Sequence, residues 1–388
     1  MPTIPFQERK SCFRGAMDVL TLRYPGFLFG TGLGRSLPVF HFHEALPDAL
    51  EPYFRHLAEN GYRTVTSEAI DALVLRGVDP GPKSVAICFD DAWSSLWFVV
   101  QPLLETYGLT AIVYVSPDRV PSVPEQARPP FDGPIPPVVD RMPPLFCTWS
   151  ELKALHALGR MDIQAHSWRH AQVFSSGGIS GFIRPDQTAH PHDIPLLETP
   201  DGLRFATRED LGAPLYPMRS RLSDVRRWRN PAAFEACTTW VRGNGGASFF
   251  DRPDWEKQLR RKAREAGPGV PETMEQEQNA VTEELAQSRN MLESQLGKKI
   301  THMCFPWAIA GETAVQAAAR VGFHTACSDR LGGRRAVHAG DPPYRLMRLK
   351  HLWIPCLPGQ GRKWFFLPKY PGASNGMDLT PPRLPETA

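Results

Sequence analysis

The chain has 388 residues, 42% of them hydrophobic, so it can bury one large core or two ordinary ones. Its 44 basic and 41 acidic residues leave a formal net charge of +3, which argues against nucleic acid or another polyanion as the partner. No run of eighteen or more apolar residues occurs without a charge, and charges and a proline interrupt the N-terminal region. We therefore expect neither a transmembrane segment nor a secretory signal.

The cysteines indicate the compartment. Seven of them are scattered from Cys12 to Cys356, and none forms a C-x-x-C pair. An odd number of scattered cysteines is typical of reduced thiols rather than of a disulfide framework. We therefore expect a cytoplasmic protein.

Strand-like and helical segments alternate after an expected N-terminal arm, residues 1–36, and this alternation predicts an α/β fold. Residues 85–89 and 111–115 are almost continuously apolar, which favours strands covered on both faces, as in a parallel sheet or barrel. Functional side chains are then expected at the carboxyl ends of the strands. The predicted strands are 37–43, 84–89, 110–115 and 161–165, and the predicted helices are 47–60, 67–75, 94–107 and 150–158.

Two segments interrupt the alternation. The first, residues 117–144, is rich in proline and predicts a surface loop. The second, residues 171–270, predicts an insertion into a catalytic domain of residues 37–358, and we interpret it as a substrate-recognition subdomain. Beyond it the pattern predicts helix 272–296, strand 300–305, helix 312–321, strands 323–327 and 346–354, and an irregular tail over 359–388.

Two short motifs carry candidate chemistry. Asp90 and Asp91 close one apolar run, and His166 and His170, four residues apart, follow another. Carboxylates and imidazoles are ligands that suit zinc or another divalent first-row metal, and one carboxylate remains for proton transfer. Each motif alone has an ordinary interpretation, since Asp91 could be a helix N-cap. Together they predict a metal site beside a base.

A third motif, Cys304–Trp307, follows a later strand-like run. In this order the motifs Cys88–Asp91, His166–His170 and Cys304–Trp307 resemble those of the polysaccharide deacetylase family, the NodB-homology carbohydrate esterases of family 4. The usual landmarks of that family are T-F-D-D, H-[ST]-x-x-H and an aromatic-Pro-Tyr or R-x-P-Y turn. The resemblance covers about residues 37–354 without the insertion. It implies a distorted (β/α) barrel, similar to a TIM barrel but not a complete eightfold one.

The resemblance also implies an activity, the removal of an N-acetyl group from an N-acetylated sugar or polysaccharide by a metal-dependent hydrolase. It implies that Asp91, His166 and His170 bind the metal, with zinc the first choice and cobalt, manganese or nickel the alternatives. Asp90 would be the general base. Pro306 and Trp307 would form the turn whose backbone N–H contacts the substrate oxyanion.

The chain departs from the family pattern in the residues that would assist the base and supply the acid. Cys304 stands where many members have an arginine that orients the base. Arg348 is a candidate replacement, and the equal alternative is that Arg348 is an ordinary surface or structural arginine. His351 resembles the histidine of the late L-x-H motif and is a candidate general acid. His43, at the end of the first strand, competes for that role and is a candidate substrate contact. Trp307 replaces the usual tyrosine.

The insertion is expected to carry substrate specificity. Its arginine-rich segment, residues 219–229, suggests a contact with a charged group on the substrate, and its tryptophans suggest stacking on sugar rings. The alternative is that Trp228, Trp240 and Trp255 pack the subdomain. The sequence His190–Asp193 could bind metal, but its proline favours a solvated turn.

Two other functions remain open from the sequence. The first is hydrolysis of another non-peptide C–N bond, in a formamide or a cyclic amide, by the same kind of metal site. The second is a degenerate, non-catalytic carbohydrate-binding protein, for which Cys304 in place of an arginine would be a symptom.

Overall fold

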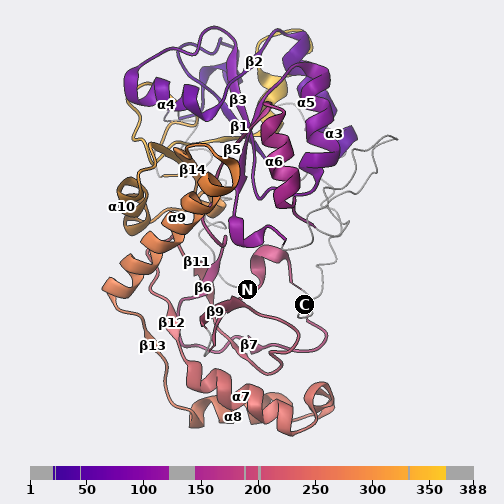
Figure 1. The fold of residues 1–388 in the computed structure, drawn as a ribbon, viewed down its shortest axis with the longest axis vertical. Coiled ribbons are helices and arrows are strands. Elements are labelled where there is room, and N and C mark those ends of the chain that lie inside the picture. The colour runs from indigo at the N-terminus through magenta and orange to yellow at the C-terminus, as the bar shows by residue number, and fades with distance from the viewer. Residues whose placement is uncertain are drawn as a thin grey trace.

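The computed structural model describes residues 21, 23–43, 45–121, 145–187, 189–199, 202–330 and 333–363. Most of the predicted arm, proline-rich loop and tail lies outside these residues. A helix-wrapped sheet occupies the upper part of the view in Figure 1, and the elements of the predicted insertion occupy the lower part. No helix among the described residues is long and apolar enough to cross a membrane.

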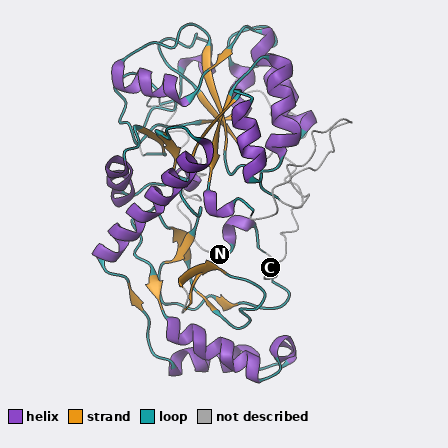
Figure 2. Cartoon of the chain, viewed as in Figure 1, coloured by secondary structure: helices purple, strands orange, loops and turns teal. Residues whose placement is uncertain are grey.

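A parallel sheet forms the centre of the larger part (Figure 2). The two edges of this sheet approach each other, because a parallel bridge joins Cys327, in one edge strand, to Leu346, just before the other edge strand. The sheet therefore curves into a distorted barrel. This confirms the predicted fold class. In spatial order the strands are β15 (Thr325–Cys327), β14 (His302–Cys304), β5 (Met161–Ala165), β4 (Ala111–Val115), β3 (Ser84–Phe89), β1 (Val39–Phe42) and β16 (Leu349–Lys350), and β2 (Arg63–Thr64) pairs with β3 beside them.

The strands form where the sequence is apolar on both faces. Every residue of β3 and β4 is buried, as expected for strands covered on both sides. Because side chains alternate along a strand, Ile87 and Val113 pack outward against the helices, whereas Cys88 and Tyr114 pack inside the barrel. Burying each large apolar side chain stabilises the fold by about 2 kcal/mol.

Helices cover the outside of the barrel. α6 and α9 begin with capping boxes in which Thr148 and Thr273 accept the first free backbone N–H groups. The predicted helix 94–107 is divided, since a π-helical turn, η2 (Leu96–Val100), precedes α5. The helices are α3 (Pro47–Glu59), α4 (Ser67–Arg76), α5 (Gln101–Tyr107), α6 (Trp149–Ala157), α9 (Met274–Leu296) and α10 (Glu312–Val321).

The residues of the predicted insertion build short antiparallel strand pairs and a helical hairpin. The hairpin has an apolar cluster of its own that includes Phe182, Cys237 and Leu259. α9 then leads from the lower part back to the barrel (Figure 1). The elements are β6 (Gln172–Phe174), β7 (Gly181–Phe182), β8 (Leu196–Thr199), β9 (Gly202–Phe205), β10 (Pro214–Leu215), β11 (Met218–Ser220), β12 (Trp228–Arg229), α7 (Pro231–Gly243), η6 (Gly246–Asp251), α8 (Trp255–Glu265) and β13 (Val270–Pro271).

One predicted strand is largely wrong. The segment 346–354 was expected to be extended, but β16 contains two residues and the 3-10 helix η8 (His351–Cys356) follows it. Pro355 lies within this turn, and a proline cannot donate to a strand ladder. His351 therefore starts a helical turn instead of continuing the strand.

Candidate active site

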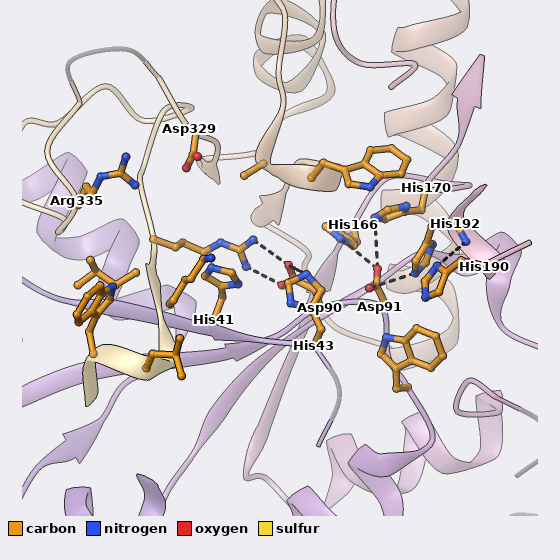
Figure 3. Close-up of a pocket in the computed structure, with 18 of the residues that line it drawn as sticks. His41, His43, Asp90, Asp91, His166, His170, His190, His192, Asp329 and Arg335 are labelled. Carbon is orange, nitrogen blue, oxygen red and sulfur yellow. Dashed lines mark hydrogen bonds and ion pairs between the residues drawn. The ribbon is translucent and has the colours of Figure 1, made fainter. Parts of the chain in front are cut away.

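A cavity of about 620 Å³ opens at the carboxyl ends of the barrel strands (Figure 3). It is lined by all three sequence motifs, through Asp90 and Asp91, His166 and His170, and Trp307. Residues of the insertion complete its wall at His190, His192 and Asp193. The position agrees with the expectation that parallel α/β folds place functional side chains at this end of their strands.

Asp91 faces two histidines across a gap suited to a cation. Its Oδ1 lies 3.5 Å from His166 Nε2 and 3.4 Å from His170 Nε2, and the three ligand atoms lie within 4.8 Å of one another. Oδ1 is buried, and no hydrogen-bond partner for it is found among the described residues. Ligands that bind zinc at about 2.0–2.1 Å in a tetrahedron lie roughly 3.3 Å apart. The three residues therefore fit a divalent metal.

His166 is oriented by a backbone group. Its Nδ1 donates a hydrogen bond to the carbonyl oxygen of Cys304, 2.6 Å away, and this leaves Nε2 turned toward Asp91. Such a bond is typical of metal-binding histidines, because it fixes the ring and its tautomer. Burial lowers the pKa of His166 and of His170, which keeps both imidazoles neutral and able to bind a metal.

The loops that carry the site have strained backbones. Eight non-glycine residues among those described have positive φ, a conformation that costs on the order of 1–3 kcal/mol each. Asp91, with φ of 73°, is one of them, and no helix begins at Ala92, so the N-cap interpretation of Asp91 is wrong. Six of the eight lie in the three motif loops: Asp91, Ala92, Ser167, His170, Trp307 and Ala308.

Asp90 forms a buried ion pair with Arg348. The two guanidinium nitrogens Nη1 and Nη2 donate to Oδ1 and Oδ2 at 2.6 and 2.8 Å. Burial alone would raise the pKa of Asp90, but the charge and hydrogen bonds of Arg348, with smaller contributions from His43 and His166, hold it well below its usual value. Asp90 is therefore ionised, and Arg348 is not a surface residue but the partner of this carboxylate.

Residues 77–190 match the family model described as polysaccharide deacetylase. Over this segment the chain resembles the polysaccharide deacetylase family. This match supports the resemblance that the three motifs carry, although the third motif lies outside the matched segment. The enzyme class of the family is that of deacetylases, which act on carbon–nitrogen bonds other than peptide bonds.

Individual relatives are distant. YxkH of Bacillus subtilis (strain 168) is 29% identical over 65 residues, which are 17% of this chain and 23% of that protein. The deacetylase domain of BpsB from Bordetella bronchiseptica has 17% sequence identity and a TM-score of 0.50, over 82% of this chain and 97% of that domain. IcaB from Ammonifex degensii has 15% identity and a TM-score of 0.45, over 81% and 92% of the two chains. The likeness to BpsB supports the fold alone.

The packing of His351 corrects the assignment of the general acid. Arg348 points into the barrel, whereas His351 starts the turn η8 and packs on the outer side of β1. Its ring stacks on Phe42 at 4.7 Å between centroids, and its Nδ1 donates to the carbonyl oxygen of His41 at 3.2 Å. Burial lowers the pKa of His351 to about 4. His351 does not line the cavity, and the prediction that it is the general acid is wrong.

His43 is the histidine that the structure brings to the cavity instead. It lines the wall, its side chain is 55% exposed, and its Nε2 lies 3.6 Å from Asp90 Oδ2. The alternation that turns Phe42 outward turns His43 inward.

The turn of the third motif places one of its two candidate residues at the cavity. Trp307 lies in the 3-10 turn η7 (Pro306–Ala308), and its ring is 4.2 Å from that of His170. Pro306, the first residue of the turn, is buried and does not line the cavity. The aromatic rings of Tyr24, Trp93 and Trp353 also line the wall.

The interpretation of residues 190–193 as a solvated turn is wrong. These residues contain the 3-10 turn η5 (Pro191–Asp193), which packs against Asp91 and His170. His192 is 7% exposed, and its ring centroid is 4.1 Å from that of His170. The only signal in the sequence was the local density of potential ligands, and the long-range contact could not be read from it.

The arginines of the insertion bind glutamates of the same chain. Arg221 pairs with Glu272. Arg229 donates from Nε to Glu198 Oε2 at 3.0 Å and from Nη2 to Glu198 Oε1 at 2.5 Å. Arg227 lies 3.6 Å from Glu198. None of the three lines the cavity, so these arginines do not support the predicted contact with a charged substrate. Trp240 and Trp255 pack against the cluster of the helical hairpin, as the alternative interpretation expected.

Proposed function

We propose that this chain is a metal-dependent hydrolase that removes the N-acetyl group from an N-acetylated sugar. The observation that supports this most strongly is that two adjacent carboxylates have separate partners. Both oxygens of Asp90 accept hydrogen bonds from Arg348, while Oδ1 of Asp91 faces two imidazoles. Hydrolysis of an acetamide needs a proton acceptor, a means of stabilising the oxyanion and an acid for the departing amine.

Asp91, His166 and His170 are proposed to hold the metal. Zinc is the first choice because two imidazoles and one carboxylate form a donor set that it commonly uses in enzymes. When bound there, the metal would act as a Lewis acid toward the acetyl carbonyl and make water acidic enough to attack it at neutral pH.

Asp90 is proposed to accept the proton of the attacking water. Arg348 holds the carboxylate ionised and fixes its orientation from the residue before β16, two strands along the sheet from β3. The non-catalytic alternative depended on the arginine missing at Cys304. Because Arg348 supplies a guanidinium to the same carboxylate, that alternative loses its main support.

His43 is proposed to protonate the departing amine, since it lies in the cavity wall beside Asp90. The rings of Trp93, Trp307 and Trp353 are suited to stacking on the faces of a sugar. Arg335 and Lys350 also line the cavity, so a negative charge on the substrate remains part of the proposal.

A substrate panel tests the proposal. The purified chain is analysed for bound metal and assayed on N-acetylated oligosaccharides, N-formylated analogues and cyclic amides, with acetate, formate and ring-opened product measured separately. We expect about one divalent metal ion per chain, on the three-ligand site described above, and release of acetate from the first group. Release of formate or ring opening without acetate would favour the alternative hydrolase, and a metal-bound chain that hydrolyses none of them would contradict the proposal.

The cytoplasmic location also remains a proposal. The six cysteines within the described residues are free, as expected of a protein in a reducing compartment. Fractionation of cells that express the tagged chain tests it.

A further inference from the structure

His192 comes from the insertion and ends beside a proposed metal ligand. The family match stops at residue 190, so His192 lies outside it. Its side chain is 8% exposed, and its Nε2 lies 3.2 Å from Asp91 Oδ2. Among the described residues, neither nitrogen of its ring has a hydrogen-bond partner of good geometry, so Asp91 Oδ2 is the polar atom that Nε2 faces at ion-pair distance. Burying a polar ring without hydrogen-bond partners costs free energy, so the position of His192 beside Asp91 calls for a functional explanation.

The two oxygens of Asp91 face different histidines. Oδ1 is the oxygen nearest His166 and His170, and Oδ2 is the oxygen nearest His192. Figure 3 shows the rings of all three histidines turned toward this one carboxylate. Metal-binding carboxylates are usually held by a hydrogen bond to the oxygen that is not on the metal. The position of His192 corresponds to that of such a donor.

Contacts from both sides hold His192 in place. Gln172 follows the second metal-site histidine by two residues, and its Nε2 donates to Asp193 Oδ1 at 3.0 Å and to the carbonyl oxygen of His192 at 3.3 Å. The backbone N–H of His192 donates to His190 Nδ1 at 3.3 Å, which closes the turn. On the other side the ring packs at 6.0 and 6.1 Å between centroids against Trp93 and Phe146.

We propose that His192 is a positioning residue of the metal centre, donating from Nε2 to Oδ2 of Asp91 and so holding Oδ1 toward His166 and His170. This rests on the metal-dependent function proposed above. The insertion then contributes to metal affinity, in addition to forming part of the cavity wall.

Metal titration of four full-length proteins tests the proposal. The wild type, His192→Leu, His192→Gln and His156→Gln are stripped of metal, and zinc affinity is measured by competition with a chromophoric chelator. Leucine keeps much of the buried volume without an N–H, and glutamine keeps an N–H close to the position of Nε2. His156, in α6, is a partly buried histidine away from the cavity and serves as the control.

We expect His192→Leu to weaken zinc binding by about 10- to 100-fold, the usual effect of losing such a donor. We expect His192→Gln and His156→Gln to stay within about threefold of the wild type, a change of less than 1 kcal/mol. Wild-type affinity in His192→Leu would overturn the proposal. If the leucine variant does not fold without metal, as judged by circular dichroism, His192→Asn replaces it, because its shorter amide does not reach Oδ2.

Cobalt substitution separates positioning from direct ligation. The visible spectrum of the Co²⁺-loaded protein should keep its band positions in His192→Gln, since the three ligands are unchanged. A shifted spectrum would mean that His192 is itself a ligand and would overturn the positioning role. A wild-type chain that binds neither metal would instead contradict the proposed function, so the two failures are distinguishable.

Discussion

The two halves of the candidate site are built differently. Asp90 and Arg348 lie at strand ends, point into the barrel and satisfy each other with two hydrogen bonds. Asp91 and His170 lie in loops with positive φ, and each has a buried polar atom that lacks a partner among the described residues. The half formed by Asp90 and Arg348, the proposed base half, has its hydrogen bonds satisfied within the folded barrel. The other half, Asp91 with His166 and His170, is the proposed metal half, and it contains buried polar atoms that a bound cation could help to satisfy.

The largest expected effect breaks the metal half. Asp91→Ala should lose bound metal and bring deacetylation to the background rate, because it removes the carboxylate that both histidines face. Removing the metal from the wild type with a chelator should have the same effect and be reversed by zinc. Elemental analysis and an amine-release assay measure both. Asp186→Ala, at an exposed aspartate of the insertion, is the control, and an Asp91→Ala protein with full metal content would contradict this assignment.

The next effect breaks the base half alone. Asp90→Asn should keep the metal and lower kcat by about 10²- to 10⁴-fold, because the amide cannot accept the proton that the carboxylate accepts. Metal analysis and steady-state kinetics on the same preparation separate the two halves. An active Asp90→Asn enzyme would show that Asp90 is not the base.

Arg348 tests whether the base half is a structural unit as well. Arg348→Met leaves the Asp90 carboxylate buried without its partner, which should cost about 3–5 kcal/mol of unfolding free energy and reduce turnover. Arg348→Lys keeps the charge but not the two parallel bonds, so it should recover part of each. Urea unfolding and kcat measure the two effects. Zinc affinity should be nearly unchanged in both variants, and an equal loss of affinity would mean that the halves are not independent.

The smallest effect concerns the barrel interior behind the base. His302 is buried, its Nε2 is 2.8 Å from the Tyr114 hydroxyl, and burial lowers its pKa from 6.5 to about 4. The unfolded chain therefore binds this proton first as the pH falls. The contribution to stability is complete above pH 6.5 and is lost between pH 6.5 and 4, by roughly 3 kcal/mol in total.

His302→Asn should accordingly flatten the fall in unfolding free energy between pH 6.5 and 4, whatever its stability at pH 7. Urea unfolding at several pH values measures the slope. The matched variant His156→Gln, at a partly exposed histidine, should change that slope less. Parallel slopes for His302→Asn and the wild type would mean that other groups account for the acid sensitivity.

Much of the fold could be predicted because it is determined by local periodicity. The predicted strand 84–89 and helix 312–321 have the observed bounds, since apolar runs and helix ends are local signals. The strand at 346–354 failed because its end is set by a proline turn and by packing rather than by apolar character. The solvated-turn interpretation of His192 failed because nothing local reveals what covers a loop.

By itself, the sequence determined the parallel α/β class and the order of the three motifs, because both depend on short-range patterns. The resemblance that the motifs carry then pointed to Asp91, His166 and His170 as the proposed metal ligands. Only the tertiary structure decided which residues complete the two halves. Arg348 reaches Asp90 across 258 positions of the chain, and His192 reaches Asp91 from the insertion. Arg348 faces inward and His351 outward because β16 pairs with β1 and then ends in the turn η8. Such pairings depend on the closure of the barrel, and spacing along the chain does not encode them.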